Sequence, residues 1–177
     1  TAMALLSSAD KGLRLATIQE RAKRFDVLLR MQGAAQANSL THGGWVVMEA
    51  LDRFRKEKWI QKLSDEKGEI IQIHSEYRVT IEYYKNGLIH YIAPHAMLAT
   101  AILCTGSCHG DETLRLFLTQ IFLLRYEFPT DPTTSLEDLA RRCRAEMAEY
   151  GALISDEDQG YEIGDRVLLE ELSGLVL

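Results

Sequence analysis

The sequence predicts a mainly α fold with a minor β component, and three observations lead to that prediction. Only three of the 177 residues are proline, and residues that favour helices dominate the chain. Apolar residues recur at helical spacing in several long segments, whereas β-branched runs are few and short. With 46% hydrophobic and 26% charged residues, a chain of this length can bury a core without disulfides or metal. We therefore expect one helical bundle over residues 1–177.

Residues 1–80 are predicted to form a helix–turn–helix unit with a short hairpin. Apolar positions predict a helix over residues 18–31, and Gly33 is placed to end it. A second helix is expected to begin near residues 41–45 and to run to about residue 63.

The β component of this unit is expected to follow a turn at Lys67 and Gly68. The β-branched run GEIIQI, which ends at Ile73, then predicts a strand. Residues 76–80 are the candidate hairpin partner of that strand.

Residues 81–130 are predicted to form the central apolar helices. The first should begin at Ile81 and be ended or kinked by Pro94. A nearly all-apolar helix is expected over residues 96–104. Asp111 can cap a third helix, which should run to about Phe128 and lie centrally in the core because it is apolar almost all round.

Residues 131–177 are predicted to form a second helix–turn–helix unit after the turn-rich segment FPTDPTTS. Ser135 and Asp138 approximate a capping box at the start of a helix. Residues 152–155 and 160–163 could form a small hairpin resembling a wing. A last helix is expected over residues 165–172.

The two flanking units resemble each other in sequence, as residues 18–38 and 136–156 show. Each segment begins with an apolar residue, continues with acidic and Ala-basic groups, and has a glycine fifteen residues after its start, at Gly33 and Gly151. Either the chain contains two repeated winged-helix-like units, or two amphipathic helices are similar by chance.

The net charge of −6 and the pI of about 5.4 argue against a general nucleic-acid-binding protein. One basic segment, RFRKEKWIQK (residues 53–62), departs from this balance. It is either the solvated face of a helix or a contact for phosphate or anionic lipid.

Three cysteines, at positions 104, 108 and 143, favour a reducing compartment over a disulfide framework. Cys104, Cys108, His109 and Asp111 lie close together in CTGSCHGD, but one C-x3-C pair is a weak metal signal. We predict no metal site and no cofactor, and we expect two small cysteines at a helix junction instead.

The ends of the chain and its apolar runs bear on its cellular context. No signal peptide is predicted, because the first residues lack a basic start. The runs at residues 96–104 and 116–124 are each too short to span a bilayer. Thr1 and Ala2 are either a cloning remnant or part of a longer protein, and both ends look cut.

The segment IEYYKNGLIHY (residues 81–91) carries the most unusual polar residues of the chain. On a helix, Tyr83, Asn86 and His90 share one face, and an Asn86–His90 hydrogen bond is easy to form. A catalytic role for His90 would require a nucleophile or an orienting acid, and none is spaced nearby. We expect a buried polar network that fixes the packing of two helices, and no catalytic residue.

YYKNGLIHYIAPHAMLATAIL resembles the C-terminal part of the membrane-associated glycerol-3-phosphate acyltransferases of the bacterial and mitochondrial type. That family shows a Tyr-Tyr-Arg-Asn segment, a following His and an apolar Ala-rich helix. Tyr83, Tyr84, Asn86 and His90 fit this pattern, and Lys85 replaces the arginine.

A second segment, LLRYEF, is similar to the Leu-(Arg/Lys)-x-Glu-Phe sequence of the same family. It contributes Arg125 and Glu127, which we add to the predicted packing network. The resemblance covers about residues 81–128, roughly a quarter of the chain, and the flanking helices agree only in general character.

The resemblance implies a parent enzyme that transfers an acyl group from acyl-CoA or acyl carrier protein to glycerol 3-phosphate in phospholipid biosynthesis. The family's catalytic pair is His-x4-Asp, and none of the five histidines here has an Asp at that spacing. The chain should thus be a non-catalytic C-terminal region that is inactive alone. Its expected partners are the parent's catalytic domain and, through the parent, a membrane surface on the cytoplasmic side.

Two other classes of function remain open from the sequence. One is an independent helical adaptor or winged-helix-like module, for which the acidic balance leaves protein partners and not DNA. The other is an enzyme that uses His90, for which no supporting partner is visible. An exposed apolar patch would favour the acyltransferase region, because a detached domain loses its docking partner.

Overall fold

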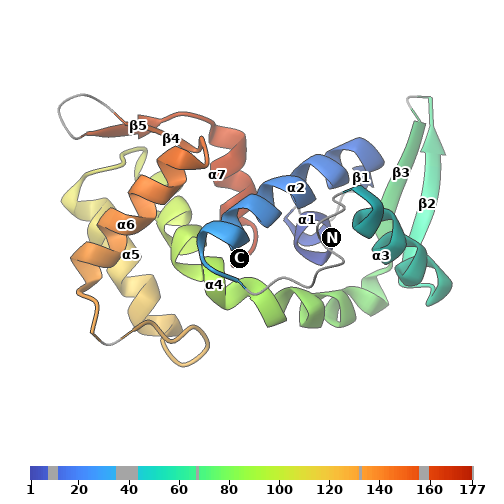
Figure 1. Cartoon of the computed structure of the whole chain (residues 1–177), viewed down its shortest axis with the longest axis horizontal. Coiled ribbons are helices and arrows are strands. Elements are labelled where there is room, and N and C mark those ends of the chain that lie inside the picture. Colours follow the sequence, from blue (N-terminus) through green and yellow to red (C-terminus); the bar gives the residue numbers. More distant parts are fainter. Residues whose placement is uncertain (8–11, 35–43, 67, 132, 156–159, 177) are drawn as a thin grey trace. The chain divides into compact units, whose positions relative to one another are not determined.

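The computed structural model describes residues 1–7, 12–34, 44–66, 68–131, 133–155 and 160–176 (Figure 1). The chain forms two compact units, Thr1–Leu88 and Ile89–Leu177. Both are mainly helical and each contains one small sheet, which confirms the predicted fold class. The boundary falls inside the segment 81–130, which was predicted to hold the central helices. The division into 1–80, 81–130 and 131–177 stays a prediction.

The first unit has the element order of a winged-helix fold. Its strands form one antiparallel sheet in the order β1-β3-β2, so the first strand pairs with the last. The elements in chain order are α1 (Ala2–Leu6), β1 (Leu13–Arg14), α2 (Leu15–Met31), α3 (Gly44–Lys56), β2 (Ile60–Asp65), β3 (Gly68–Ile73), the 3-10 helix η2 (Ser75–Tyr77) and the start of α4 (Arg78–Thr105).

The second helix of this unit is shorter than predicted. It ends at Lys56, and Lys58 has a left-handed backbone (φ 60) that stops the helix. Ile60, which the helical pattern placed on an inner helix face, is buried instead as the first residue of β2. Over so short a run, a single buried apolar residue fits the helical period and the strand period equally well, which explains the wrong boundary.

The predicted hairpin partner of β3 is also wrong. Residues 76–80 lie in η2 and the start of α4, and β3 pairs with β2 and β1. The register joins Asp65 to Gly68, whose φ of 118 suits glycine. The turn therefore connects β2 to β3. Lys67, the other predicted turn residue, lies outside the described residues.

The second unit contains the rest of α4 and, after it, α5 (Asp111–Leu124), α6 (Leu136–Glu149), β4 (Leu153–Ser155), β5 (Tyr161–Ile163) and α7 (Arg166–Ser173). The strands β4 and β5 pair antiparallel, which confirms the predicted wing-like hairpin. The N–H of Asp138 donates to Ser135 Oγ at 3.0 Å, which confirms the predicted cap of α6. Asp165 caps α7 in the same way.

Pro94 does not end a helix, so the first of its two predicted effects, an end or a kink, is wrong. Helix α4 runs unbroken from Arg78 to Thr105 with Pro94 inside it. The residues around Pro94 that face the core are fully buried, among them Ile92, Ala93 and Ala96. Packing of this apolar segment compensates for the hydrogen bond that proline cannot donate.

The continuity of α4 also changes the expectation drawn from its short apolar runs. The helical segment Ser75–Thr105 is long and apolar enough, by length and composition alone, to cross a membrane, with a mean hydropathy of 1.4. However, 61% of this apolar stretch is buried inside the protein, as in an ordinary core helix. This is weak evidence for a membrane span.

The apolar composition of α5 predicted a central place in the core, and this prediction is wrong. Thr113, Phe117 and Ile121 form its buried face, whereas Phe122 and Leu123 are 62% and 66% exposed. The helix ends at Leu124, before the predicted end, and its N-cap is the residue before Asp111 without a side-chain hydrogen bond. Because the segment is apolar almost all round, its sequence has no helical periodicity that would show which side chains are buried and which are exposed.

Helices α2 and α6 end in the same way, at the two glycines that the sequence comparison aligned. Gly33 and Gly151 have φ values of 68 and 87. In each case the glycine N–H donates to the carbonyl three residues earlier, and the next N–H donates to the carbonyl five residues earlier. This is the Schellman pattern, in which a left-handed glycine satisfies the last carbonyls of the helix.

Candidate functional site

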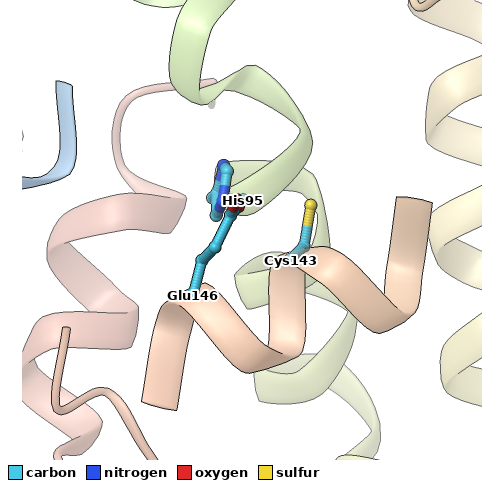
Figure 2. Close-up of side chains that lie close together, drawn as sticks. All are labelled: His95, Cys143 and Glu146. Atoms are coloured by element: carbon cyan, nitrogen blue, oxygen red, sulfur yellow. Dashed lines mark hydrogen bonds and ion pairs between the residues drawn. The ribbon is translucent and has the colours of Figure 1, made fainter. Parts of the chain in front are cut away.

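Three polar side chains meet inside the second unit, between α4 and α6 (Figure 2). His95 comes from α4, one residue after Pro94, and Cys143 and Glu146 come from α6. Residues three apart on a helix lie on the same face, so α6 presents both ligand-type side chains together. The ligand atoms of the three residues all lie within 4.8 Å of one another.

A short hydrogen bond joins the two helices at this site. His95 Nε2 and Glu146 Oε2 are 2.7 Å apart, and the side chains of His95 and Glu146 are 2% and 20% exposed. Hydrogen bonds of this length with an ionised carboxylate are among the stronger ones in proteins. The contact therefore fixes the packing of α4 against α6.

The other nitrogen of the same imidazole has no such contact. His95 Nδ1 is buried and finds no hydrogen-bond partner among the described residues. An unsatisfied buried polar atom costs about 1–3 kcal/mol. A water molecule hydrogen-bonded to Nδ1 would remove that cost.

Cys143 is a protonated thiol at neutral pH. Burial and, to a smaller extent, the negative charge of Glu146 together raise its pKa to about 12. Thiols act as nucleophiles and metal ligands in the thiolate form. Without a cation beside it, Cys143 is thus chemically inert, and a Cys–His nucleophilic pair does not describe this site.

The exposure of the three side chains limits what the site can do. His95 and Cys143 are fully covered, and only Glu146 reaches solvent at one edge. A substrate of ordinary size would not reach His95, whereas a single ion or water could enter past Glu146. The donor set of one nitrogen, one sulfur and one carboxylate oxygen suits a transition-metal ion such as Zn²⁺.

The residues that the sequence singled out in the segment 81–91 do not form the predicted buried network. Tyr83 is 78% exposed, and Tyr84, Asn86 and His90 are exposed as well. Within the described part of the chain, no hydrogen bond joins Tyr83, Asn86 and His90. Their shared face points to solvent because Ile81 and Ile89 occupy the buried side of α4.

The tyrosine rings of this segment make ring contacts, and the Tyr91 ring lies 4.2 Å from that of His90. In the first unit, Tyr84 packs against Phe54 and Trp59, with ring centroids 6.0 and 5.7 Å apart. Tyr83 lies edge-on to Tyr84 at 6.0 Å. These residues of the first unit form a partly exposed aromatic cluster.

Arg125 and Glu127, the other two predicted network residues, are exposed at the end of α5. The Arg125 guanidinium lies 4.1 Å from the ring centre of Phe122 and 4.4 Å from that of Tyr126. Tyr126 is 83% exposed. With Leu123 these residues make an exposed apolar and cationic patch, which we call the α5 patch (Phe122, Leu123, Arg125 and Tyr126).

The residues of CTGSCHGD are placed apart from the three-residue site. Cys104 is exposed, and Cys108 is buried, which raises the pKa of its thiol. The Cys108 carbonyl accepts a hydrogen bond of 2.9 Å from Arg144 Nε. His109 stacks on Tyr161 of the wing hairpin and accepts a hydrogen bond from its N–H.

Sequence reasoning therefore missed the site that the fold assembles. His95 has no partner near it in the sequence, because Cys143 and Glu146 lie about fifty positions later in the chain. Sequence reasoning noted Cys143 only in the cysteine count. The one signal available was the i, i+3 spacing of Cys143 and Glu146 on a helix whose buried face includes Cys143.

Comparisons with known proteins give one consistent result. A family model described as "Glycerol-3-phosphate acyltransferase C-terminal region" matches residues 1–174. The proteins named glycerol-3-phosphate acyltransferase from Shewanella pealeana and Shewanella halifaxensis are each 25% identical to this chain, over 116 and 118 residues. These alignments cover 64% and 66% of this chain but only 14% of each relative. No solved structure matches.

Proposed function

Because the chain belongs to the family of glycerol-3-phosphate acyltransferase C-terminal regions, we propose that it is the non-catalytic C-terminal region of such an enzyme. It supports transfer of an acyl group from acyl-CoA or acyl carrier protein to glycerol 3-phosphate, in phospholipid biosynthesis. The match over residues 1–174 is the observation that carries this proposal.

The chemistry of the chain agrees with a supporting role. The catalytic His-x4-Asp pair of the resembling family is missing from its sequence. His95 and Cys143 are buried, and the raised pKa of Cys143 favours the thiol over the nucleophilic thiolate. The chain alone is thus expected to be inactive.

Two exposed surfaces are candidates for the contact with the catalytic domain of the parent. The first is the aromatic cluster of the first unit, with Tyr83 and Tyr84 at its exposed side. The second is the α5 patch, whose large apolar side chains are exposed. Exposed aromatic and arginine side chains are typical anchors of protein interfaces.

The cellular setting of the parent belongs to the same proposal. We place the parent at the cytoplasmic side of a membrane, as a peripheral or membrane-associated enzyme. The basic residues at the end of α3, among them Arg53 and Lys56, are exposed and could contact anionic headgroups through the parent.

The test compares the full-length parent with a form that lacks this region. Acyl transfer from labelled acyl-CoA to glycerol 3-phosphate is measured for the parent, for the truncated form, and for the 177-residue chain with and without His90→Ala. We expect no activity from the chain and a strong loss in the truncated form, with recovery when the chain is added back. Activity of the chain that disappears with His90→Ala, or full activity of the truncated form, would refute the proposal.

The winged-helix order of the first unit favours a second candidate, an interaction module that binds another protein. In that case α3 or the sheet, and not the α5 patch, would be the contact surface. The two candidates differ in one readout, because an independent module would bind its partner without changing acyl transfer by the parent.

A further inference from the structure

We infer that His95, Cys143 and Glu146 form a binding site for one thiophilic transition-metal ion, with Zn²⁺ as the expected ion. The three side chains supply the nitrogen, sulfur and oxygen donors that Zn²⁺ binds in proteins. Their ligand atoms already lie within 4.8 Å of one another. The inference concerns the second unit alone and does not depend on the proposed function.

The geometry requires only small adjustments to accept an ion. Zn²⁺ lies about 2.0–2.3 Å from nitrogen, oxygen and sulfur ligands, so its ligand atoms sit about 3–4 Å from one another. The 2.7 Å separation of His95 Nε2 and Glu146 Oε2 is slightly shorter than this spacing. Side-chain rotation of Glu146, which is the least buried of the three, can open the space without moving either helix.

The charges of the site favour a divalent cation. A thiolate and a carboxylate this close together in a buried place would repel each other without a cation between them. A Zn²⁺ ion neutralises both anions in a buried place. On binding, the Sγ–H bond breaks, the thiolate electron pair forms the zinc–sulfur bond, and the proton passes to solvent.

The two imidazole nitrogens of His95 have different roles, because an ion beside Glu146 would bind Nε2 and would leave Nδ1 on the other side of the ring. His95 is 2% exposed, and its Nδ1 has no hydrogen-bond partner in the described parts of the chain. Buried histidines normally satisfy both ring nitrogens, and metal-binding histidines use one of them for the ion. Three protein ligands leave one tetrahedral position for water or for the second Glu146 oxygen.

The site is distinct from the cysteine pair that the sequence made visible. Cys104 is exposed, and no ligand group of three that includes Cys104 or Cys108 occurs among the described residues. Cys108 is buried like Cys143, but it belongs to no such group of three among the described residues. Cys108 is therefore a matched control.

The experiment titrates the 177-residue chain, after treatment with a chelator, with Co²⁺ and then with Zn²⁺. Co²⁺ bound to a thiolate in a tetrahedral site gives a charge-transfer band and visible d–d bands, and Zn²⁺ displaces both. We expect one equivalent of each ion, with proton release on binding. Cys143→Ser should remove the charge-transfer band and weaken zinc binding by at least about tenfold, whereas Cys108→Ser should leave both unchanged.

Further arms keep the result decisive. Glu146→Gln keeps the size and a hydrogen bond to His95 but loses the charge, so zinc binding should again weaken while the far-UV circular dichroism stays unchanged. If Cys143→Ser fails to fold, the charge-transfer band and the stoichiometry of the unmodified chain decide. Absence of a thiolate band in the folded chain, or the same band in Cys143→Ser, would overturn the inference.

Discussion

At the scale of single residues, the acid–base behaviour of the second unit is concentrated where α4 meets α6. His95 and Glu146 hold the two helices together through one hydrogen bond of 2.7 Å. Cys143, one turn away on α6, stays protonated because it is buried beside a carboxylate. Each of these properties can be measured separately.

The thiol of Cys143 should make the folded state less stable as the pH rises. Its pKa is about 12 when folded, against an ordinary value of 9.0. Above about pH 9 the unfolded chain therefore binds fewer protons than the folded chain, and the free energy of unfolding falls by up to about 1.4 kcal/mol per pH unit. The stabilising contribution is fully present below the unfolded pKa and is lost as the pH approaches 12.

The measurement is denaturant unfolding of the metal-free chain between about pH 8 and about pH 10, for the unmodified protein and for Cys143→Ala. The difference between their free energies of unfolding should shrink steadily with pH. A difference that stays constant would mean that Cys143 ionises equally in both states.

Removal of the Glu146 carboxylate should destabilise the chain. Glu146→Ala leaves His95 Nε2 buried without its partner, so we expect a loss of about 1–3 kcal/mol in the free energy of unfolding. Glu146→Gln retains a neutral hydrogen bond and should lose less. Glu149→Ala, an exposed position on the same helix, serves as the control and should change stability by less than about 0.5 kcal/mol. Equal losses at both positions would contradict this account.

The site could not have been predicted from the sequence, for a physical reason that these residues show. The partners of His95 follow more than forty residues later, and only the packing of α4 against α6 brings them together. Tyr83, Asn86 and His90 share a helix face, as the sequence indicated, but periodicity could not tell which side of that helix is covered. Glu146 lies at the edge of the buried face of α6, where the sequence pattern does not distinguish buried from exposed side chains.

At the scale of elements, local signals with their own geometry were read correctly. The Ser135 cap, the wing hairpin and the end of α2 at Gly33 all depend on neighbours in the sequence. The wrong predictions concern elements whose secondary structure is decided by tertiary packing. Pro94 remains inside α4 because packing outweighs the lost hydrogen bond, and β2 was taken as helix because its inner residues are buried in either form.

The start of α6 offers a direct test of one local signal. Ser135→Ala removes the side-chain oxygen that accepts the Asp138 N–H at 3.0 Å, so stability should fall by about 1 kcal/mol. Ser135→Gly should lower stability by only a few tenths of a kcal/mol, because glycine tolerates the cap conformation. Thermal or denaturant unfolding of the two variants gives the comparison, and an equal effect of both would show that the hydrogen bond contributes little.

The sheet of the first unit offers a second element-scale test at Gly12. A methyl group there would lie 2.4 Å from Ile70 Cγ2 and 3.0 Å from the carbonyl oxygen of Ile71. Gly12→Ala should thus push β1 from β3 and cost about 1–3 kcal/mol, the usual cost of overpacking. Gly87→Ala, in the open middle of α4, has nothing within 4 Å and should be neutral or stabilising. A stable Gly12→Ala would show that the β1 pairing yields easily.

At the scale of the whole molecule, the charge balance sets what the chain can associate with. A net charge of −6 gives a repulsive background for polyanions, in which the basic residues after position 52 are a local exception. We expect no retardation of duplex DNA by the chain at physiological salt in a gel-shift assay. Binding at that salt concentration, lost in Arg53→Glu with Lys56→Glu, would show that α3 acts as a recognition helix.

The glycines that end α2 and α6 have a consequence for how far this family can diverge. At Gly33 and Gly151 the backbone is left-handed, so a residue with a side chain would strain it regardless of the open space around it. Relatives already differ from this chain at three of every four aligned positions. Among such distant sequences, we expect these two positions to remain glycine or asparagine more often than most core residues keep their identity. The two positions can therefore anchor the alignment of remote members of the family.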